Sequence, residues 1–222
     1  MMLPREGIVL IDKPAGMTSF GVVARVRRVL SSAHGTKIKV GHTGTLDPFA
    51  TGLMILVIGA TCRQSEQFLK LDKWYEATIR LGEVSSTGDP EGEKTKVSTD
   101  RPSAEAVQAV LQDLTGDILQ TPPAFSAIKV GGRRAYDLAR AGKEVVLPPR
   151  KVTVYALEVI DYQYPLLQIR THVSSGTYIR SMAQAIGEQL GTGAYCQALR
   201  RTRIADYDVA QAYMLKDLGI HS

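Results

Sequence analysis

Apolar residues recur along this chain at two spacings, and each spacing predicts a different kind of element. Positions three and four residues apart predict helices over residues 20–31, 103–114 and 136–141, and from 179 to a stop at Gly191. Alternating or continuous apolar runs predict strands over residues 7–11, 53–58, 71–82, 152–160, 166–173 and 193–204. Helices and strands are therefore both expected along the whole chain.

Polar residues between these elements predict caps and loops. Thr18 and Ser19 stand where they can cap the first helix, and Ser175 and Thr177 stand where they can cap the last one. Residues 83–99 are rich in Ser, Thr, Gly and charge, so a solvated loop without a catalytic role is expected there.

Length and composition narrow the class of protein. The 222 residues, 44% of them hydrophobic, can bury a proper core as one large domain or two small ones. The N-terminus lacks an apolar signal core, and no apolar stretch approaches the ~20 residues that span a bilayer, so a cytoplasmic location is expected. Cys62 and Cys196 fit no disulfide framework or zinc motif, so we expect buried free thiols. His34, His172 and His221 lack ligand-like spacing, so no metal site is expected.

Positive charge is concentrated in one segment. The chain has 27 Lys and Arg against 22 Asp and Glu, a net charge of +5 that suits a polyanionic partner. Residues 129–151 hold seven basic residues and two acidic ones. Such a run is ordinarily a solvated surface, but the Gly and Pro residues that bound the segment 121–151 favour a mobile basic arm that clamps phosphates.

The candidate chemistry centres on residues 41–52, which read GHTGTLDPFATG. Three glycines and a proline exclude a regular element, so this stretch is expected to be a loop, anchored by the apolar strand that follows Gly52. Asp47 lies at its centre and Pro48 biases it toward an extended backbone. An Asp at such a place is often only a turn-former that caps backbone N–H groups. The alternative is a catalytic carboxylate held on a rigid edge.

The pattern GHTGTLDPxATG resembles the catalytic motif of TruB-type tRNA pseudouridine synthases. Two further blocks resemble the same family: DKPAGMTS at residues 12–19 and SSGTYIR at residues 174–180. The resemblance extends from Gly7 to about Leu218. It implies a mixed α/β (α+β) fold, in which a large, mostly antiparallel central sheet is flanked by helices.

The resemblance also implies a role for each candidate site residue. Asp47 would be the catalytic residue and Arg180 its ion-pair partner. The implied substrate contacts are stacking of Tyr75 on the uracil, pocket walls from Tyr178 and Leu199, contact of His42 with RNA, and an approach to the active site at Lys13. Taken alone, Tyr75 is equally a core aromatic, Lys13 a solvated turn lysine, and the Leu-Arg-Arg strand at 199–201 a basic edge strand.

An Arg in the first turn of a helix opposes the helix dipole, so Arg180 needs a nearby anion. We expect that anion to be Asp47.

The implied activity is isomerisation of uridine 55 in the T-arm loop of tRNA. The expected organisation is one catalytic domain over residues 1–222, with the arm at 121–151 gripping the RNA and no C-terminal PUA domain. No cofactor is needed because substrate and product are isomers. A monomer with tRNA as its partner and no membrane contact is expected. Asp47 could attack C1′ or C6 of the target, or take a proton from C2′.

Two other functions remain open on the residues alone. A non-catalytic RNA-binding or tRNA-folding protein would use the same basic arm and aromatic residues without requiring Asp47. A nucleotide-binding enzyme would use residues 41–52 as a phosphate loop, although this stretch lacks the Gly-Lys-Ser/Thr ending of such loops.

Overall fold

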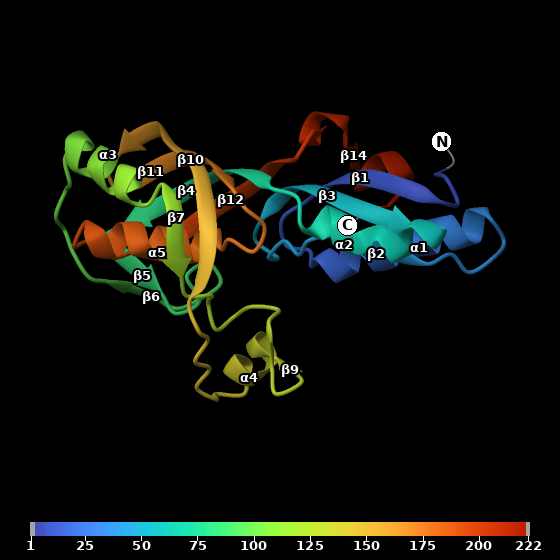
Figure 1. Cartoon of the computed structure of the whole chain (residues 1–222), viewed down its shortest axis with the longest axis horizontal. Coiled ribbons are helices and arrows are strands. Elements are labelled where there is room, and N and C mark those ends of the chain that lie inside the picture. Colours follow the sequence, from blue (N-terminus) through green and yellow to red (C-terminus); the bar gives the residue numbers. More distant parts are fainter. Residues whose placement is uncertain (1–2, 221–222) are drawn as a thin grey trace. The chain divides into compact units, whose positions relative to one another are not determined.

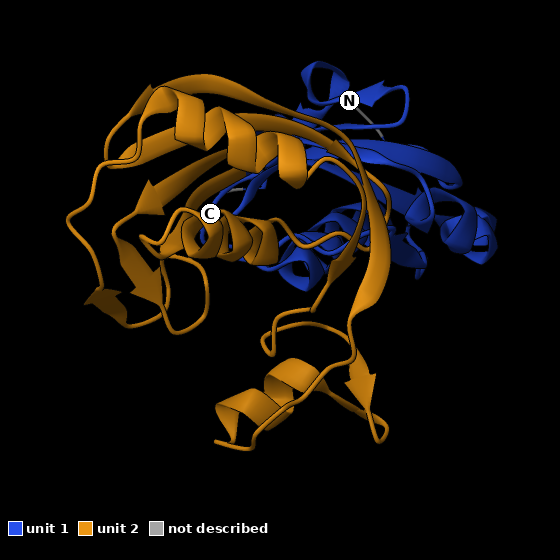
Figure 2. Cartoon of the chain, turned by 60° about the vertical axis from the view of Figure 1, so that its left-hand side comes forward, with its two compact units in different colours: residues 1–75, 200–222 blue, residues 76–199 orange. Residues whose placement is uncertain are grey.

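The structure of the protein is a computed structural model, in which residues 3–220 are described. The chain forms two compact units (Figure 2). Unit 1 comprises residues 1–75 and 200–222, and unit 2 comprises residues 76–199. Two strands, β4 (Lys73–Leu81) and β12 (Ala194–Ile204), begin in one unit and end in the other.

Unit 1 is built around the apolar run that follows the central loop. Its other elements are β1 (Gly7–Lys13), α1 (Ser19–Ala33), β2 (Val40–His42), β3 (Thr51–Ile58), η1 (Gly59–Gln64), α2 (Ser65–Leu69), β13 (Tyr207–Asp208), η2 (Val209–Gln211), β14 (Tyr213–Met214) and η3 (Leu215–Leu218). Every residue of β3 from Gly52 to Ile58 is buried, so this strand anchors the loop before it as predicted. Leu53 and Ile55 of this strand form a core cluster with Ile204 of β12.

Unit 2 holds the second half of the sheet and the basic arm. Its elements are β5 (Glu83–Ser85), β6 (Lys94–Lys96), α3 (Ala104–Asp113), β7 (Gly116–Gln120), β8 (Lys129–Val130), β9 (Arg133–Arg134), α4 (Ala135–Arg140), β10 (Arg150–Gln163), β11 (Leu166–Val173) and α5 (Ile179–Gln189). The hairpin β8–β9 and helix α4 form the arm, which begins after β7 and returns to the unit at β10 (Figure 1).

The large sheet is mixed, with strand order β14-β1-β3-β12-β4-β11-β10-β7 and with β2 beside β3 and β13 beside β12. The pairs β1–β3, β2–β3, β10–β11 and β10–β7 are antiparallel, whereas β1–β14 and β3–β12 are parallel. The predicted mixed α/β fold with a large central sheet is confirmed. β12 lies between β3 and β4, so the reading of residues 199–201 as part of an edge strand is wrong.

Most helices and strands lie where capping residues and apolar patterns in the sequence predict them. The first helix begins after Thr18, whose side chain caps it by accepting from the Gly21 N–H at 3.0 Å, and its buried face carries Val22, Val23, Val26 and Leu30. Ser103 caps α3 in the same way. In β4, buried positions alternate with partly exposed ones, as the pattern over residues 71–82 predicts.

Three further sequence expectations are wrong. Residues 83–99 are not a plain solvated loop, because they contain the β5–β6 hairpin and bury both Ser85 and Asp89. Ser175 and Thr177 do not cap α5, which begins after Tyr178 without a side-chain cap. Cys196 is a buried free thiol, whereas Cys62 is partly exposed.

Candidate active site

The loop over residues 43–50 joins β2 to β3 and is fastened at both ends. At its start, the Thr43 backbone N–H and hydroxyl both donate to the Ile55 carbonyl, at 3.2 and 3.3 Å. At its end, Gly52 has a φ of +106°, and a Cβ there would lie 2.2 Å from the Arg201 carbonyl oxygen. Only glycine fits such a conformation at such a close approach, so position 52, the second residue of β3, requires glycine.

Asp47 lies between two residues that other parts of unit 1 hold in place. On one side, the Ser19 hydroxyl accepts from the Leu46 N–H at 2.8 Å and donates to the Leu46 carbonyl at 3.0 Å. On the other side, the Pro48 carbonyl accepts from the Lys13 ammonium at 3.1 Å and from the Gly16 N–H at 2.8 Å. These four bonds fix the backbone on each side of the carboxylate.

Lys13 lies at the end of β1 and its side chain is 0% exposed. The interpretation of Lys13 as a solvated turn lysine is therefore wrong. Its ammonium donates to the carbonyls of Pro14, Met17 and Pro48 at 2.9, 2.7 and 3.1 Å. An ammonium has three N–H donors and here all three have acceptors. Lys13 therefore shapes the backbone beside Asp47.

Arg201 donates to backbone carbonyls near both ends of the same loop. Its side chain is buried, at 1% exposure, and donates to the Leu53 carbonyl at 2.7 Å and the Gly44 carbonyl at 3.2 Å. The neighbouring Arg200 forms a two-bond pair with Asp12, at 3.1 and 2.7 Å. The two arginines after Leu199 thus have structural partners in unit 1, which the sequence did not reveal.

The remaining candidates of unit 1 have fewer described contacts. His42 ends β2, and its Nδ1 accepts from the Gly44 N–H at 3.4 Å. Tyr75 lies on the buried face of β4. Their predicted substrate contacts stay predictions.

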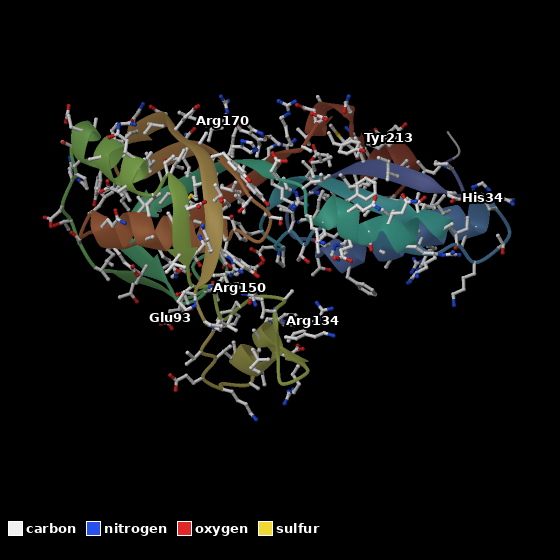
Figure 3. All side chains as sticks on the ribbon, in the orientation of Figure 1. His34, Glu93, Arg134, Arg150, Arg170 and Tyr213 are labelled. Carbon is white, nitrogen blue, oxygen red and sulfur yellow. The ribbon has the colours of Figure 1, made fainter. Side chains whose placement is uncertain are left out.

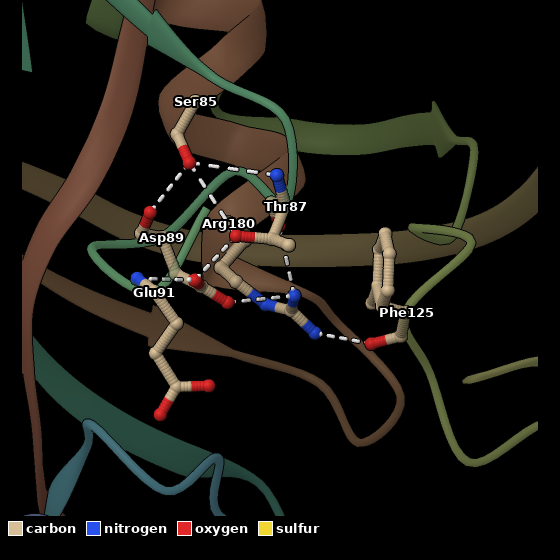
Figure 4. Close-up of polar contacts among 6 residues, drawn as sticks. All are labelled: Ser85, Thr87, Asp89, Glu91, Phe125 and Arg180. Atoms are coloured by element: carbon tan, nitrogen blue, oxygen red, sulfur yellow. Dashed lines mark hydrogen bonds and ion pairs between the residues drawn. The ribbon is translucent and has the colours of Figure 1, made fainter. Parts of the chain in front are cut away.

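In unit 2, Arg180 is the centre of a buried polar network (Figure 4). Its guanidinium donates from Nη1 to the Thr87 carbonyl and to Asp89 Oδ2, both at 3.0 Å, and from Nη2 to the Phe125 carbonyl at 2.6 Å. Asp89 supplies negative charge near the N-terminal end of α5, which an Arg in the first helical turn requires. The predicted pairing of Arg180 with Asp47, which lies in unit 1, stays a prediction.

Asp89 is a functional candidate that the sequence reading missed. It is 4% exposed, and its Oδ1 accepts from the Thr87 hydroxyl at 2.5 Å and the Glu91 N–H at 3.0 Å. Its backbone carbonyl accepts from the Ser85 hydroxyl at 2.6 Å. The available signal was an Asp-Pro step in a stretch with Gly and Thr, which is also found at Asp47.

Tyr178 is held at the start of α5 by Gln120, the last residue of β7. The Gln120 amide accepts from the Tyr178 N–H at 2.7 Å and donates to the Tyr178 carbonyl at 3.0 Å. These two bonds fix the backbone of the residue that precedes the helix, although no side chain caps the first-turn N–H groups of α5. Leu199, the other predicted pocket residue of unit 2, is buried in β12.

The seven predicted site residues are divided between the units. Lys13, His42, Asp47 and Tyr75 belong to unit 1, whereas Tyr178, Arg180 and Leu199 belong to unit 2. Across residues 3–220, no group of three or more His, Cys, Asp or Glu side chains could hold a metal ion. In the same part of the chain, no helix is long and apolar enough to cross a membrane. His221 lies outside the described residues.

Two family models match the sequence. One, described as TruB family pseudouridylate synthase (N terminal domain), matches residues 27–179. The other, described as tRNA pseudouridylate synthase B C-terminal domain, matches residues 180–220. Together they match residues 27–220, which include residues of both units.

Solved structures share the fold. A chain of a Cbf5-Nop10-Gar1 complex matches with a TM-score of 0.74 at 30% identity, covering 96% of this chain and 53% of that chain. A chain of an H/ACA RNP bound to a substrate RNA containing 2′-deoxyuridine matches with a TM-score of 0.68 at 27% identity, covering 98% of this chain and 57% of that one. This chain therefore spans little more than half the length of these solved chains.

Curated relatives are more similar. The chain is 44% identical over 213 residues to tRNA pseudouridine synthase B of Azoarcus sp. (strain BH72), which covers 96% of this chain and 69% of the relative. It is 42% identical over 214 residues to the protein of the same name from Aquifex aeolicus (strain VF5), with 96% and 73% covered. With a family model over more than half of its residues and relatives of this similarity, the chain belongs to the TruB family of pseudouridylate synthases.

Proposed function

We propose that this protein converts uridine to pseudouridine at position 55 in the T-arm loop of tRNA, with Asp47 as the catalytic carboxylate. The observation that carries the proposal is the fixed backbone on both sides of Asp47, where Ser19 holds Leu46 and Lys13 holds Pro48. A catalytic group gains most when its position is set before the substrate arrives. The relatives named tRNA pseudouridine synthase B support tRNA as the substrate.

The reaction breaks the bond between C1′ and N1, turns the uracil, and joins C5 to C1′. C5 loses its hydrogen as a proton and N1 gains a proton. Atoms and electrons balance without an oxidant, reductant or energy-rich cofactor. The protein must therefore supply a positioned carboxylate and a closed pocket that retains the detached base. Asp47 fits the first need by its placement between two held residues.

Base recognition in this proposal depends on Tyr75, Tyr178 and Leu199. A uridine in a folded loop must leave its stack, which costs a few kcal/mol. Stacking on an aromatic ring stabilises the flipped base by about 1–3 kcal/mol, and Tyr75 would provide that ring. His42 would contact the RNA beside the target, and Arg180, held by Asp89, would act near the reacting groups.

The arm of residues 121–151 would grip the RNA backbone. Figure 3 labels Arg134 in the arm and Arg150 where the chain returns to β10. Lys129, Arg133 and Arg134 lie in the exposed strands of the arm hairpin. Five net positive charges in a short exposed segment favour contacts to phosphates. We also propose that the protein is a cytoplasmic monomer and that its reaction needs no cofactor.

Tritium release from C5-labelled uridine in a T-arm stem-loop tests this function. The wild type should release tritium, and Asp47→Asn should abolish release while RNA binding stays within about two-fold, since phosphate contacts dominate the interface. Asp206→Asn is the matched control because Asp206 is an exposed aspartate of the same unit. It should behave as the wild type.

Other results would favour another function. Tight RNA binding without release by the wild type would indicate a non-catalytic RNA-binding or tRNA-folding protein. Equal turnover by Asp47→Asn and the wild type would contradict the role of Asp47. Binding of ATP would favour a nucleotide-binding enzyme that uses residues 41–52 as a phosphate loop.

A further inference from the structure

The segment from Lys13 to Leu46 contains no acidic residue. Between Asp12 and Asp47 the sequence has six basic residues: Lys13, Arg25, Arg27, Arg28, Lys37 and Lys39. This segment therefore carries +6, more than the net charge of +5 of the whole chain. It lies outside the arm of residues 121–151, so it is a second concentration of positive charge.

The structure gathers three of these cations on one surface of unit 1. Arg27, Arg28 and Lys37, with Ala24 and Ser31, line an open concavity of about 390 Å³. Arg28 and Lys37 are exposed and Arg27 is half-buried. The apolar face of α1, with Val22, Val23, Val26 and Leu30, packs into the unit, whereas Arg28 is exposed to solvent. We name Arg27, Arg28 and Lys37 the α1 basic surface.

Some surface cations of this protein have carboxylate partners. Surface pairs link Lys70 to Glu66, Arg80 to Glu83, Lys151 to Asp117, Arg170 to Glu76, and Arg203 to Asp208. Within residues 3–220, the three cations of the α1 basic surface form no such ion pair. Their charges therefore remain uncompensated by the protein, and their mutual repulsion favours an external anion.

The helix dipole does not account for these residues. Basic side chains stabilise a helix when they lie in its last turn, where the backbone carbonyls are unpaired. The last turn of α1 has no basic residue, and Arg27 and Arg28 lie in the middle of the helix. A role in helix stability is thus a poor explanation for placing both arginines here.

The concavity also offers one neutral donor, the Ser31 hydroxyl. Ser31 Oγ accepts from the Ile38 N–H at 3.1 Å, which leaves its own O–H available as a donor. Arginine forks bind phosphate oxygens through two parallel N–H bonds. Two guanidinium groups, an ammonium and a hydroxyl around one open space are a donor set for phosphate.

The position of α1 connects this surface to the candidate active site. The helix begins at Ser19, which holds Leu46 beside Asp47, and Arg27 and Arg28 follow eight and nine residues later. At 1.5 Å per residue they lie about 12–14 Å along the helix from Ser19. That distance is beyond a single target nucleotide but within reach of the strand that flanks it.

We propose that the α1 basic surface binds backbone phosphates of the substrate RNA outside the target loop. The proposal rests on the proposed function, since it requires an RNA substrate. Its contacts are sequence-independent and add affinity without touching the reacting nucleotide. The surface thereby helps to select a folded RNA in which a second stretch of backbone lies at this distance from the target uridine.

The test compares Arg27→Gln/Arg28→Gln with the wild type on an unmodified tRNA transcript. We expect the Kd to rise about ten-fold at low salt and the slope of log Kd against log salt to fall by about 1.4–1.8, the loss of two phosphate contacts. The turnover number for tritium release at saturating RNA should stay within two-fold, because the surface does not touch the reacting atoms.

The matched control is Lys70→Gln/Arg203→Gln, which removes the same charge from exposed, carboxylate-paired sites of unit 1. It should change the Kd less than two-fold. Identical Kd and salt slope for the two double variants would overturn the proposal. So would an unchanged tRNA affinity with lost binding to anionic phospholipid vesicles, which would make the surface a membrane site.

Failure of the proposed function gives a different result. In that case the wild type itself would release no tritium, whatever the double variants do. If the wild type neither binds nor modifies the transcript, both proposals fall. If the wild type is active and the two double variants bind alike, only the α1 basic surface is refuted.

Discussion

One hydroxyl group, that of Ser19, satisfies both backbone polar groups of Leu46, although the two residues are 27 positions apart. Ser19 Oγ accepts from the Leu46 N–H at 2.8 Å and donates to the Leu46 carbonyl at 3.0 Å. Both side chains are buried. These two hydrogen bonds link the first turn of α1 to the residue before Asp47. The start of the helix therefore holds the candidate catalytic loop in place.

Ser19→Ala should therefore lower turnover more than RNA affinity. Each buried backbone group of Leu46 that loses its partner costs about 1–3 kcal/mol, and relaxation of the loop would displace Asp47. We expect the turnover number to fall about 10–100-fold with the KM for the stem-loop within three-fold. Ser32→Ala, at an exposed position of the same helix, is the control. A KM effect as large as the turnover effect would indicate a general loss of structure instead.

Asp89→Asn should destabilise unit 2 strongly. Removing the charge from one member of a buried ion pair leaves the other charge buried without compensation, which costs about 3–5 kcal/mol. Arg180 would be left in that state, since both side chains are almost fully buried. Urea unfolding measures the loss. Asp117→Asn breaks an exposed pair with Lys151 in the same unit and should have a much smaller effect. Similar losses for both variants would contradict this view of Asp89.

The parts of the fold that follow from local pattern were predictable. A helix with a capping Thr18 and an apolar face, a strand as apolar as β3, and the alternation of β4 each carry their signal within a few neighbouring residues. The basic arm was predictable for the same reason, because its charges and its bounding Gly and Pro residues are adjacent in sequence. Family resemblance supplied the connection between these pieces.

Interactions between distant residues were not predictable. Gln120 holds Tyr178 from 58 positions away, and Asp89 pairs with Arg180 from 91 positions away. Polar residues such as Ser85 and Asp89 look solvated in a Gly- and Ser-rich sequence, and only the tertiary fold buries them. A short polar stretch can therefore hold a buried network when a helix supplies the opposite charge.

Gly52→Ala should prevent folding or reduce the free energy of unfolding by more than about 3 kcal/mol. The substitution forces a side chain into a left-handed conformation and places its Cβ 2.2 Å from a backbone oxygen of β12. Gly35→Ala isolates the first effect, because Gly35 has a φ of +62° with no atom within 4 Å of the added Cβ. That control should lose only about 1–2 kcal/mol. Equal losses in urea unfolding would show that the close approach to Arg201 carries no penalty.

Lys73, like the nearby Arg201, is a buried cation. The environment of Lys73 makes the free energy of unfolding depend on pH. Its ammonium donates to the Leu69 carbonyl at 2.8 Å and to the Leu71 carbonyl. Burial, followed by the positive charge of Arg201, lowers the pKa of Lys73 from 10.5 to about 8, and Asp72 opposes the shift. The folded protein then releases this proton near pH 8, whereas the unfolded chain keeps it until about pH 10.5.

Between these two pH values the unfolded state binds more protons, so the contribution of Lys73 makes stability rise with pH. From about pH 7.5 to about pH 9.5, the free energy of unfolding of the wild type should increase by about 2 kcal/mol more than that of Lys73→Met, as measured by urea unfolding. Lys70→Met, at a neighbouring exposed lysine, should follow the wild type. Parallel pH curves for the wild type and Lys73→Met would mean that Lys73 stays protonated in the folded protein throughout this range.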